Sequence, residues 1–516
     1  MSLVEFLKER AKEFKNKVFL WERKNSLTYQ EFDQVTDRMA AGLQALGLEK
    51  GNHAAVLFPN SIDTLLSYFA IIKAGGTAIP INPLYTLREI AFILNNSQAK
   101  FLLAAPQFQR AVEGVRSQVP GLKQAVFRSE DEPSILRAIA RVSPGGSSLK
   151  PVELSSRDNA IIFYTSGTLG TPKGVMLTHE NFTFSGPNIA RCYGLKPDDI
   201  TMAVLPLVHV FAVASPIFGS LSSGGTVVVV DRFQAETVLQ AFVDYRVTWF
   251  PGVPTMFNYI YHAYEKGTYN VSSIRMGLSG GASLSVELLK NWEKRFNAEI
   301  LEVYGLTEST GLVTANPVHG VRKAGSIGIT VPNVQTRLVD KENKDVVRGE
   351  VGEILFRGPN ATKGYWKLPE QTAESIRDGW VCTGDLARQD EEGYFFIVGR
   401  KKDLMITGGY NVYPREIEEV LYTHPAVYEA AVIGVADEVK GEVAKAYIAL
   451  KPGQTATEKE IVEFCKQNLA PYKVPRQVEI RSELPKSSTG KILHRELRIE
   501  KKGGIQNPEV RSQESE

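Results

Sequence analysis

The sequence contains few cysteines and almost no net charge. Only three of its 516 residues are cysteines, and 60 basic residues are balanced by 58 acidic ones. Cys192, Cys382 and Cys465 lie far apart and lack the spacing of a zinc site, so we expect neither a disulfide framework nor a zinc centre. This usage is typical of a reducing, cytoplasmic location. Near-neutral charge gives no electrostatic reason to expect a nucleic-acid partner.

Long apolar segments are also scarce. Residues 1–18 mix charged and apolar residues at helical spacing and lack the continuous apolar core of a signal peptide, which predicts a surface helix. Residues 202–221 carry no charge, but Pro206, Pro216 and His209 argue against a membrane span. We predict instead a strand from 202 to 205, a loop with His209, a helix near 211–221 and a strand from 226 to 230. No integral membrane segment is expected, while peripheral membrane contact and a homodimer are compatible with the sequence.

The length and the 43% hydrophobic content predict a globular chain of more than one domain. Residues 55–79 and 203–228 both show the pattern strand, helix, Gly-Gly-Thr, strand. Such units imply parallel strands joined by helical crossovers, and therefore a duplicated α/β architecture. Shorter β-like runs over 335–339, 352–357 and 393–398 indicate a β-rich region. A helix from Pro414 and a strand over 430–435 are expected beyond it.

The most informative segment is YTSGTLGTPKGV, residues 164–175, which follows an apolar strand. Its glycines allow close backbone approach, its hydroxyls are donors and its lysine is a cation, so a polyphosphate is the expected ligand. A Walker A loop is excluded because Pro172, not glycine, precedes Lys173. A flexible linker is the alternative, but the strand before the segment and the apolar run after it argue against one.

Three further segments carry groups that suit a nucleotide. In Tyr304-Gly305-Leu306-Thr307-Glu308 the ring can stack on a purine, the hydroxyl can contact a phosphate and the carboxylate can bind Mg²⁺. Asp385 follows a predicted strand over 380–382, and Arg400 lies in the charged run GRKKD. The run LPKSSTGKI, residues 484–492, is a polar turn with two lysines. Taken singly, these segments are also typical of plain turns and solvated charges.

Together these segments resemble the adenylate-forming superfamily of acyl-CoA synthetases, aryl-CoA ligases, beetle luciferases and peptide-synthetase adenylation domains. Over residues 1–499 the chain looks most like bacterial medium- or long-chain fatty acyl-CoA synthetases. The resemblance implies an α/β fold whose large N-terminal domain, residues 1–399, has two duplicated parallel-sheet subdomains and a β-rich subdomain. It also implies a hinge at 400–403 and a small mobile α+β domain over 404–500. Residues 501–516 are expected to be a disordered tail.

The resemblance also implies the reaction. A carboxylate attacks the α-phosphorus of ATP, pyrophosphate leaves, and the thiol of coenzyme A then attacks the acyl-adenylate. Because the nucleophiles belong to the substrates, the lack of a nucleophilic triad is expected, and the protein contributes positioning and cations. Lys491 is the implied catalytic cation. Lys486, in the same turn, is not expected to be catalytic. For His209 the alternative is an ordinary core residue.

The resemblance assigns roles to individual positions of this sequence. The implied catalytic residues are Lys491, Glu308, Thr165 and His209, with Glu308 as the Mg²⁺ ligand. The implied ATP and AMP contacts are Thr165, Ser166, Gly167, Thr168, Gly170, Thr171, Lys173, Gly280, Gly281, Ala282, Tyr304, Gly305, Thr307, Asp385, Arg400 and Lys491. The acyl pocket is implied at His209, Phe211, Val253, Pro254, Gly280 and Gly305, the hinge at Lys402, and the coenzyme A side at Gly408, Gly409 and Tyr410.

The expected acid substrate follows from what the pocket segments lack. Residues 211–215 contain no acidic side chain to bind an amino acid's ammonium group, and the segments 252–256, 278–282 and 325–328 are small or apolar. Apolar walls favour a hydrocarbon chain by about 0.8 kcal/mol per buried methylene, so a fatty acid is expected. The alternatives are a 4-coumarate-type aryl-CoA ligase, a fatty acyl-AMP ligase serving a carrier protein, and a nucleotide-binding regulator without catalysis. Leu169 departs from the family pattern, which has Thr or Ser there.

Overall fold

The computed structural model describes residues 1–129, 134–142, 148–165, 172–266, 269–487 and 490–499. The chain divides into two compact units, Met1–Ile397 and Val398–Glu516, called here the large and the small unit. The predicted tail, residues 501–516, lies outside the described residues.

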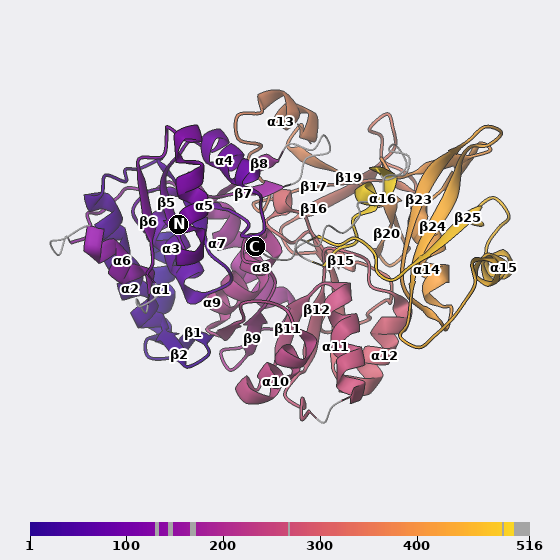
Figure 1. The fold of residues 1–516 in the computed structure, drawn as a ribbon, viewed down its shortest axis with the longest axis horizontal. Helices are drawn as coiled ribbons and strands as arrows, with labels where there is room; N and C mark the ends of the chain where they lie inside the picture. Colours follow the sequence, from indigo (N-terminus) through magenta and orange to yellow (C-terminus); the bar gives the residue numbers. More distant parts are fainter. Residues whose placement is uncertain (130–133, 143–147, 166–171, 267–268, 488–489, 500–516) are drawn as a thin grey trace, which may run out of the picture. The chain divides into compact units, whose positions relative to one another are not determined.

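The large unit contains two sheets that repeat one topology (Figure 1). The first has the strand order β6-β5-β3-β4-β7-β8, and the second contains β12-β11-β9-β10-β1-β2 in the same relation. In both, the last strand is antiparallel to its neighbour and the pairs before it are parallel. The predicted duplicated α/β architecture is therefore confirmed.

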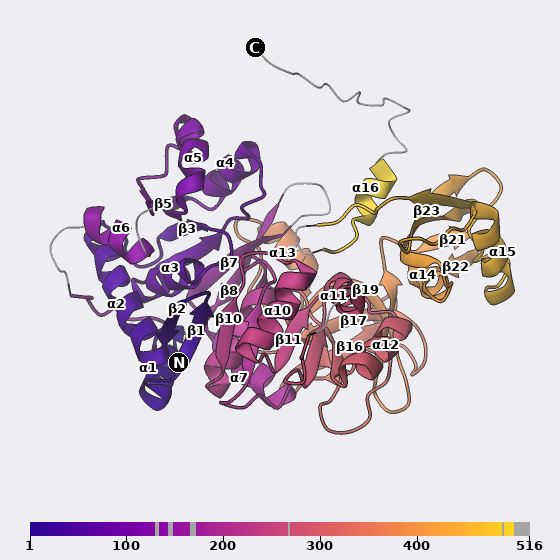
Figure 2. The same ribbon diagram turned by 60° about the horizontal axis from the view of Figure 1, so that its bottom comes forward.

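The first repeat supplies one sheet and its covering helices (Figure 2). Its sheet consists of β3 (His53–Leu57), β4 (Thr77–Pro80), β5 (Ala99–Ala104), β6 (Gln124–Phe127), β7 (Asn159–Thr165) and β8 (Lys173–Thr178). Its helices are α2 (Tyr29–Ala45), α3 (Ile62–Lys73), α4 (Leu87–Asn96), α5 (Gln109–Gly114) and α6 (Ile135–Val142), with short 3₁₀ turns at Pro106–Phe108 and Arg116–Gln118.

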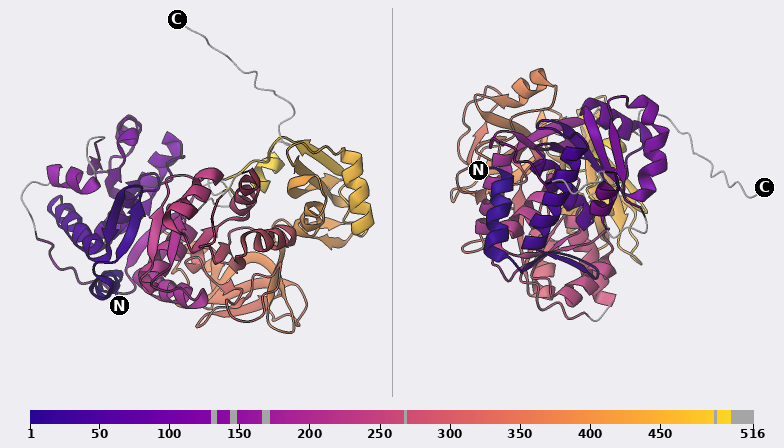
Figure 3. Two further views of the ribbon diagram at one scale, coloured as in Figure 1. Left: turned by 90° about the horizontal axis from the view of Figure 1, so that it is seen from below. Right: turned by 90° about the vertical axis from the view of Figure 1, so that its left-hand side faces the viewer.

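The second repeat lies beside the first; it is drawn mainly in magenta to pink, whereas its hairpin at residues 18–28 has the indigo of the start of the chain (Figure 3). Its strands are β1 (Val18–Glu22), β2 (Asn25–Thr28), β9 (Ile200–Ala203), β10 (Thr226–Val229), β11 (Trp249–Gly252), β12 (Met276–Ser279) and β13 (Glu299–Tyr304), extended by β14 (Thr314–Ala315) and β15 (Ile329–Thr330). Its helices are α7 (His179–Cys192), α8 (Val210–Val213), the π-helix Ala214–Phe218, α9 (Gly219–Ser223), α10 (Ala235–Tyr245), α11 (Pro254–Lys266) and α12 (Val286–Phe296). The N-terminal helix α1 (Leu3–Phe14) forms as predicted and buries its apolar face.

The Gly-Gly-Thr segments form the same turn in both repeats. Gly75 and Gly224 have φ angles of +90° and +80°, a conformation that side chains disfavour, and each ends a helix. The threonine at the start of the next strand donates its backbone N–H to the residue just before the neighbouring parallel strand. Thr77 donates to Asn52 O and Thr226 to Asp199 O, both at 2.9 Å. The repeated sequence pattern thus reflects repeated backbone geometry.

The two hairpins are exchanged between the repeats. Hairpin β1–β2 comes first in the chain but joins the second sheet through β10, whereas β7–β8 joins the first sheet through β4. Each hairpin ends in a threonine that caps the following helix, Thr28 with Glu31 and Thr178 with Asn181. The sequences LTYQEF and LTHENF around these caps are a second internal repeat.

The charge-free stretch 202–221 is broken into short elements as predicted. Strand β9 ends at Ala203, and the helical segments α8, the π-helix and α9 together run from Val210 to Ser223. Over the residues that the structure describes, no helix has the length and apolar character needed to cross a bilayer.

A β-rich region closes the large unit. It contains β16 (Gln335–Val339), β17 (Gly352–Arg357), β18 (Ile376–Arg377), β19 (Trp380–Gln389) and β20 (Phe395–Arg400), with helix α13 (Pro369–Ser375). The predicted strands 335–339 and 352–357 match β16 and β17, whereas the third predicted strand begins two residues later, at Phe395. The boundary between the two units falls within β20.

The small unit has its own apolar core between a sheet and helices. Its strands are β21 (Met405–Thr407), β22 (Tyr410–Val412), β23 (Val427–Asp437), β24 (Gly441–Leu450) and β25 (Gln477–Arg481), and its helices are α14 (Pro414–Tyr422), α15 (Glu458–Asn468) and α16 (His494–Ile499). The predicted helix from Pro414 and the strand over 430–435, now part of β23, are confirmed.

Candidate active site

The ends of the glycine-rich segment are held together by the β7–β8 hairpin. Thr165, the last residue of β7, pairs directly with Lys173, the first residue of β8. The predicted phosphate-loop residues between them lie outside the described residues: Ser166, Gly167, Thr168, Leu169, Gly170 and Thr171. Gly174 has a packing role that the sequence did not show: a Cβ there would lie 2.8 Å from Ile162 Cγ2 and 3.4 Å from Trp366 Cβ.

Residues 359–366, called here the strap, run along β8 and fix it. Gly364 O accepts the Met176 N–H at 3.0 Å, and the Trp366 N–H donates to Gly174 O at 2.8 Å. The Thr362 hydroxyl donates to Met176 O at 2.7 Å. These bonds extend the first sheet by a short antiparallel contact next to Lys173.

The strap also holds Glu308. This residue lies in the 3₁₀ turn Thr307–Ser309 that follows β13, and its backbone O accepts the Thr362 N–H at 2.7 Å. Its side-chain Oε1 accepts the Tyr365 hydroxyl at 2.9 Å. The same Tyr365 ring lies 5.3 Å from Lys173 Nζ. One strap residue therefore contacts both the predicted phosphate lysine and the predicted Mg²⁺ ligand.

Tyr304 and Asp385 meet although 81 positions separate them. The Tyr304 hydroxyl donates to Asp385 Oδ2 at 2.8 Å, and both side chains are buried. The expectation that Asp385 follows the end of a strand is wrong, because β19 continues to Gln389. Its pairing with β17 slips at this point and Gly384 has a φ of +72°, so the carboxylate is turned by a bulge inside the strand.

The loop that carries His209 is positioned by the first repeat. Asn60 donates to Leu205 O and accepts the Leu207 N–H, both at 2.8 Å, and the Tyr68 hydroxyl donates to Leu207 O at 3.1 Å. His209 is mostly buried, and this burial lowers its pKa to about 4. The imidazole is therefore neutral at pH 7.

Three glycines of the predicted acyl pocket, Gly280, Gly281 and Gly305, present main chain next to apolar side chains, and this surface is called here the wall. A Cβ on Gly280 would lie 3.3 Å from Phe211 Cζ, and one on Gly281 would lie 3.6 Å from Val253 Cγ1. A Cβ on Gly305 would lie only 2.3 Å from the carbonyl carbon of Gly311, so no side chain fits there. Ala282 follows this wall in an exposed loop, and Pro254 is the first residue of α11.

The remaining predicted residues lie in the small unit. Arg400 ends β20, and Lys402 lies in the turn where the Asp403 N–H donates to Arg400 O. Gly408 and Gly409 form the left-handed turn between β21 and β22, and Tyr410 stacks on Tyr472 at 4.5 Å between ring centroids.

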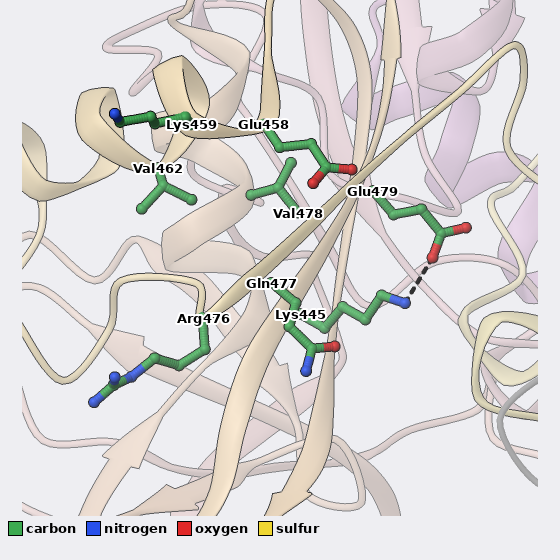
Figure 4. Close-up of a pocket in the computed structure, with 8 residues that line it drawn as sticks. All are labelled: Lys445, Glu458, Lys459, Val462, Arg476, Gln477, Val478 and Glu479. Carbon is green, nitrogen blue, oxygen red and sulfur yellow. Dashed lines mark hydrogen bonds and ion pairs between the residues drawn. The ribbon is translucent and has the colours of Figure 1, made fainter.

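Lys486 and Lys491 lie in one turn of the small unit. Lys486 Nζ pairs with the buried Glu429 carboxylate at 2.8 Å, which gives Lys486 a structural role. The backbone of Lys491 is held by Ser487, whose N–H donates to Lys491 O and whose Oγ accepts the Lys491 N–H. The groove of about 530 Å³ drawn in Figure 4, where Lys445 pairs with Glu479, contains none of the predicted residues.

The residues present fit a magnesium ion that arrives with a nucleotide. Within the described part of the chain, no three His, Cys, Asp or Glu side chains gather as they would in a resident metal centre. Mg²⁺ is commonly held by one or two carboxylates together with substrate phosphates. Glu308, one of whose oxygens accepts the Tyr365 hydroxyl, would be such a carboxylate if the Mg²⁺ of a nucleotide binds here.

Comparisons with known proteins identify the family. A model of AMP-binding enzymes matches residues 7–366, and a model of the AMP-binding enzyme C-terminal domain matches residues 416–491. The chain belongs to the AMP-binding enzyme family. The predicted class, an AMP-forming acid–thiol ligase, and the predicted α/β fold are confirmed, and the substrates common to this class are a carboxylic acid, ATP and coenzyme A.

The relatives of this AMP-binding enzyme include some that are named for aliphatic acids and some that are named for aromatic acids. It is 35% identical to the long-chain-fatty-acid–CoA ligase of Bacillus subtilis (strain 168), over 96% of this chain and 94% of the relative. It is 36% identical to the feruloyl-CoA synthase of an Amycolatopsis species, over 92% and 94% of the two chains. The crystal structure of the anthranilate CoA ligase AuaEII with anthranoyl-AMP matches with a TM-score of 0.91 and 29% identity, covering 97% of each chain.

The strap is the main feature of the site that the motifs missed. Thr362, Tyr365 and Trp366 act through long-range contacts, and no periodic pattern marks their segment. The available signal was local: a glycine followed by two aromatic residues, Gly364-Tyr365-Trp366, between polar residues and the Pro369 that starts α13.

Proposed function

We propose that this enzyme is a medium- or long-chain fatty acyl-CoA synthetase, which converts a fatty acid, ATP and coenzyme A to acyl-CoA, AMP and pyrophosphate through an acyl-adenylate. The observation that supports this most directly is the wall around Gly280, Gly281 and Gly305. The groups next to these glycines are Phe211, Val253 and the backbone of Gly311, which are all apolar side chains or main chain. Such a surface stabilises a bound hydrocarbon by about 0.8 kcal/mol per buried methylene.

In this proposal the two half-reactions use different residues. Lys173 and the loop before it hold the triphosphate, Tyr304 and Asp385 bind the nucleoside, and Glu308 is the protein ligand of Mg²⁺, which neutralises phosphate charge. His209, neutral at pH 7, lies at the fatty-acid carboxylate. Lys491 stabilises negative charge as the carboxylate attacks the α-phosphorus. The small unit then rotates at Lys402 so that Gly408, Gly409 and Tyr410 face coenzyme A.

An aryl-CoA ligase is the second candidate, and the match to the feruloyl-CoA synthase supports it. The two candidates differ in the depth of the pocket rather than in the chemistry. A long chain gains binding energy with each methylene, whereas a cinnamate fills a short, wide pocket with one ring.

Acid-dependent exchange of pyrophosphate into ATP tests the substrate. We expect kcat/KM to rise along the series from acetate to palmitate and to exceed the value for cinnamates by at least about tenfold, as several buried methylenes predict. The reverse order would assign an aryl substrate. Exchange without AMP release on addition of coenzyme A would point to a carrier-protein acceptor, and no exchange with any acid would point to a regulator.

The division between the units has its own test. Lys402→Pro should leave pyrophosphate exchange intact and abolish thioester formation, because a fixed hinge blocks the second arrangement. Lys491→Ala should remove exchange while leaving thioester formation from a supplied acyl-adenylate. Equal loss of both half-reactions in both variants would contradict the proposed alternation.

A further inference from the structure

Tyr365 is the one strap residue whose side chain contacts both Lys173 and Glu308. Its hydroxyl donates to Glu308 Oε1 at 2.9 Å, and the centroid of its ring lies 5.3 Å from Lys173 Nζ. A charge-assisted hydrogen bond fixes the direction of a carboxylate, and an ammonium group over an aromatic face is attracted to it. The two contacts use different parts of one rigid side chain.

The backbone of Tyr365 is itself well fixed. Its N–H donates to Thr372 Oγ1 at 2.9 Å, and the neighbouring Gly364 and Trp366 are bonded to β8. The hydroxyl that donates to Glu308 therefore belongs to a side chain whose backbone is held on both sides.

We propose that Tyr365 is a positioning residue that orients the Glu308 carboxylate toward the metal ion of the bound nucleotide and, through its ring, sets the place of Lys173. The inference rests on the proposed function, because it takes Glu308 as a metal ligand and Lys173 as a phosphate cation. Because one rigid side chain contacts both Glu308 and Lys173, the metal ligand and the phosphate cation are held at fixed relative positions before the substrate binds.

Tyr365→Phe isolates the hydroxyl because the ring and its contact with Lys173 remain. With the non-hydrolysable analogue α,β-methylene-ATP bound, the dissociation constant of Mn²⁺, measured by electron paramagnetic resonance, should rise about tenfold, as loss of a hydrogen bond to a charged group predicts. Affinity for the analogue without metal should stay within twofold. Tyr365→Leu also removes the ring, so affinity for the metal-free analogue should fall about fivefold.

A double-mutant cycle with Glu308→Gln separates positioning from general loosening of the fold. If Tyr365 acts through Glu308, Tyr365→Phe should change the Mn²⁺ constant less than twofold in the Glu308→Gln background. Tyr245→Phe is the matched control, since the Tyr245 hydroxyl donates to Arg23 O at 3.0 Å, outside the site. This control should leave both constants unchanged.

The outcomes keep the inference and the proposed function apart. An unchanged Mn²⁺ constant in Tyr365→Phe, with a raised constant in Glu308→Gln, would overturn the positioning role and leave the proposed function in place. A full tenfold effect of Tyr365→Phe in the Glu308→Gln background would also overturn it. The proposed function fails separately, if the wild-type protein shows no acid-dependent exchange at all.

Discussion

The two exchanged hairpins occupy equivalent places in sheets of the same topology, yet their connections differ. In β1–β2 the strands pair up to Glu22 and Asn25, and only Arg23 and Lys24 join them. In β7–β8 they pair up to Thr165 and Lys173, and residues 166–172 join them. The frame of the repeat is therefore common, and the longer connection is what distinguishes the copy with the predicted phosphate site.

The difference extends to what surrounds each hairpin. Hairpin β7–β8 is bonded to the strap, whose Tyr365 contacts both Glu308 and Lys173. At the residue after the capping threonine, the first repeat has Tyr29, whose hydroxyl donates to Ser220 O and Gly225 O. The second has His179, whose Nδ1 accepts the Leu3 N–H. The two copies of the frame therefore differ in the contacts made by their hairpins and by the residues that follow them.

The largest expected effect comes from making the two connections equal. Replacing residues 166–172 with the dipeptide Arg-Lys should reduce pyrophosphate exchange at least about 1,000-fold, because in the proposed function this connection supplies the donors that position the triphosphate. The thermal midpoint should change little, because Thr165 and Lys173 already pair. Inserting Gly-Ser-Gly between Arg23 and Lys24 is the control and should leave exchange intact. Substantial exchange by the shortened variant would show that the connection does not hold ATP.

The second expected effect concerns one lysine in each hairpin. Lys173→Ala should lower kcat/KM for ATP about 100-fold, the usual consequence of removing one charged donor from a transition state. Lys24→Ala removes an exposed lysine from the other hairpin and should have no effect. Steady-state exchange rates over a range of ATP concentrations measure both variants. Similar losses in both would mean that the asymmetry between the hairpins is not functional.

The shared frame could be predicted from the sequence where local geometry dictates the residue type. The Gly-Gly-Thr pattern was informative because Gly75 and Gly224 need positive φ angles at helix ends. Strands β16 and β17 were predicted to the residue because turn sequences bound their apolar alternation on both sides.

What could not be predicted depends on pairing between distant segments. The bulge that turns Asp385 arises from a register slip against β17, and nothing in residues 380–389 alone specifies that slip. The strap likewise owes its role to bonds with β8 and Glu308, formed mainly by backbone groups that every sequence has. The exchange of the hairpins was detectable in principle, through the repeated Leu-Thr and Phe of LTYQEF and LTHENF.

His179 and Tyr29 occupy equivalent positions, directly after the capping threonines, but only the histidine titrates in the acid range. Burial lowers the pKa of His179 to about 4, so the folded state binds its proton less readily than the unfolded state, whose pKa is about 6.5. The free energy of unfolding is therefore highest above pH 6.5, where His179 is neutral in both states, and it decreases as the pH falls from 6.5 toward 4. Between pH 7 and pH 5 the loss should be about 2 kcal/mol.

His179→Gln tests this pH dependence, because a glutamine oxygen can accept the Leu3 N–H without titrating. Urea midpoints at pH 7 and pH 5 should show a smaller acid loss in the variant, by about 2 kcal/mol. Tyr29→Phe, at the equivalent position of the first repeat, should shift both midpoints equally. An identical acid loss in wild type and His179→Gln would show that another group controls acid stability.

The smallest expected effect tests whether the Gly-Gly-Thr turns are equivalent parts of the frame. Gly75→Ala and Gly224→Ala each force a side chain into a left-handed conformation, which costs about 1–2 kcal/mol. A Cβ at Gly75 would lie 2.9 Å from Val152 Cγ1, and one at Gly224 would lie 2.4 Å from Phe14 Cε1, a partly exposed ring that packs against Tyr29. Urea midpoints should therefore fall in both variants, and further in Gly224→Ala because the overlap there is larger, with exchange activity at 25 °C preserved in both. If one variant loses exchange while keeping its stability, that turn does more than support the sheet, and the two repeats differ in their frame as well as in their connections.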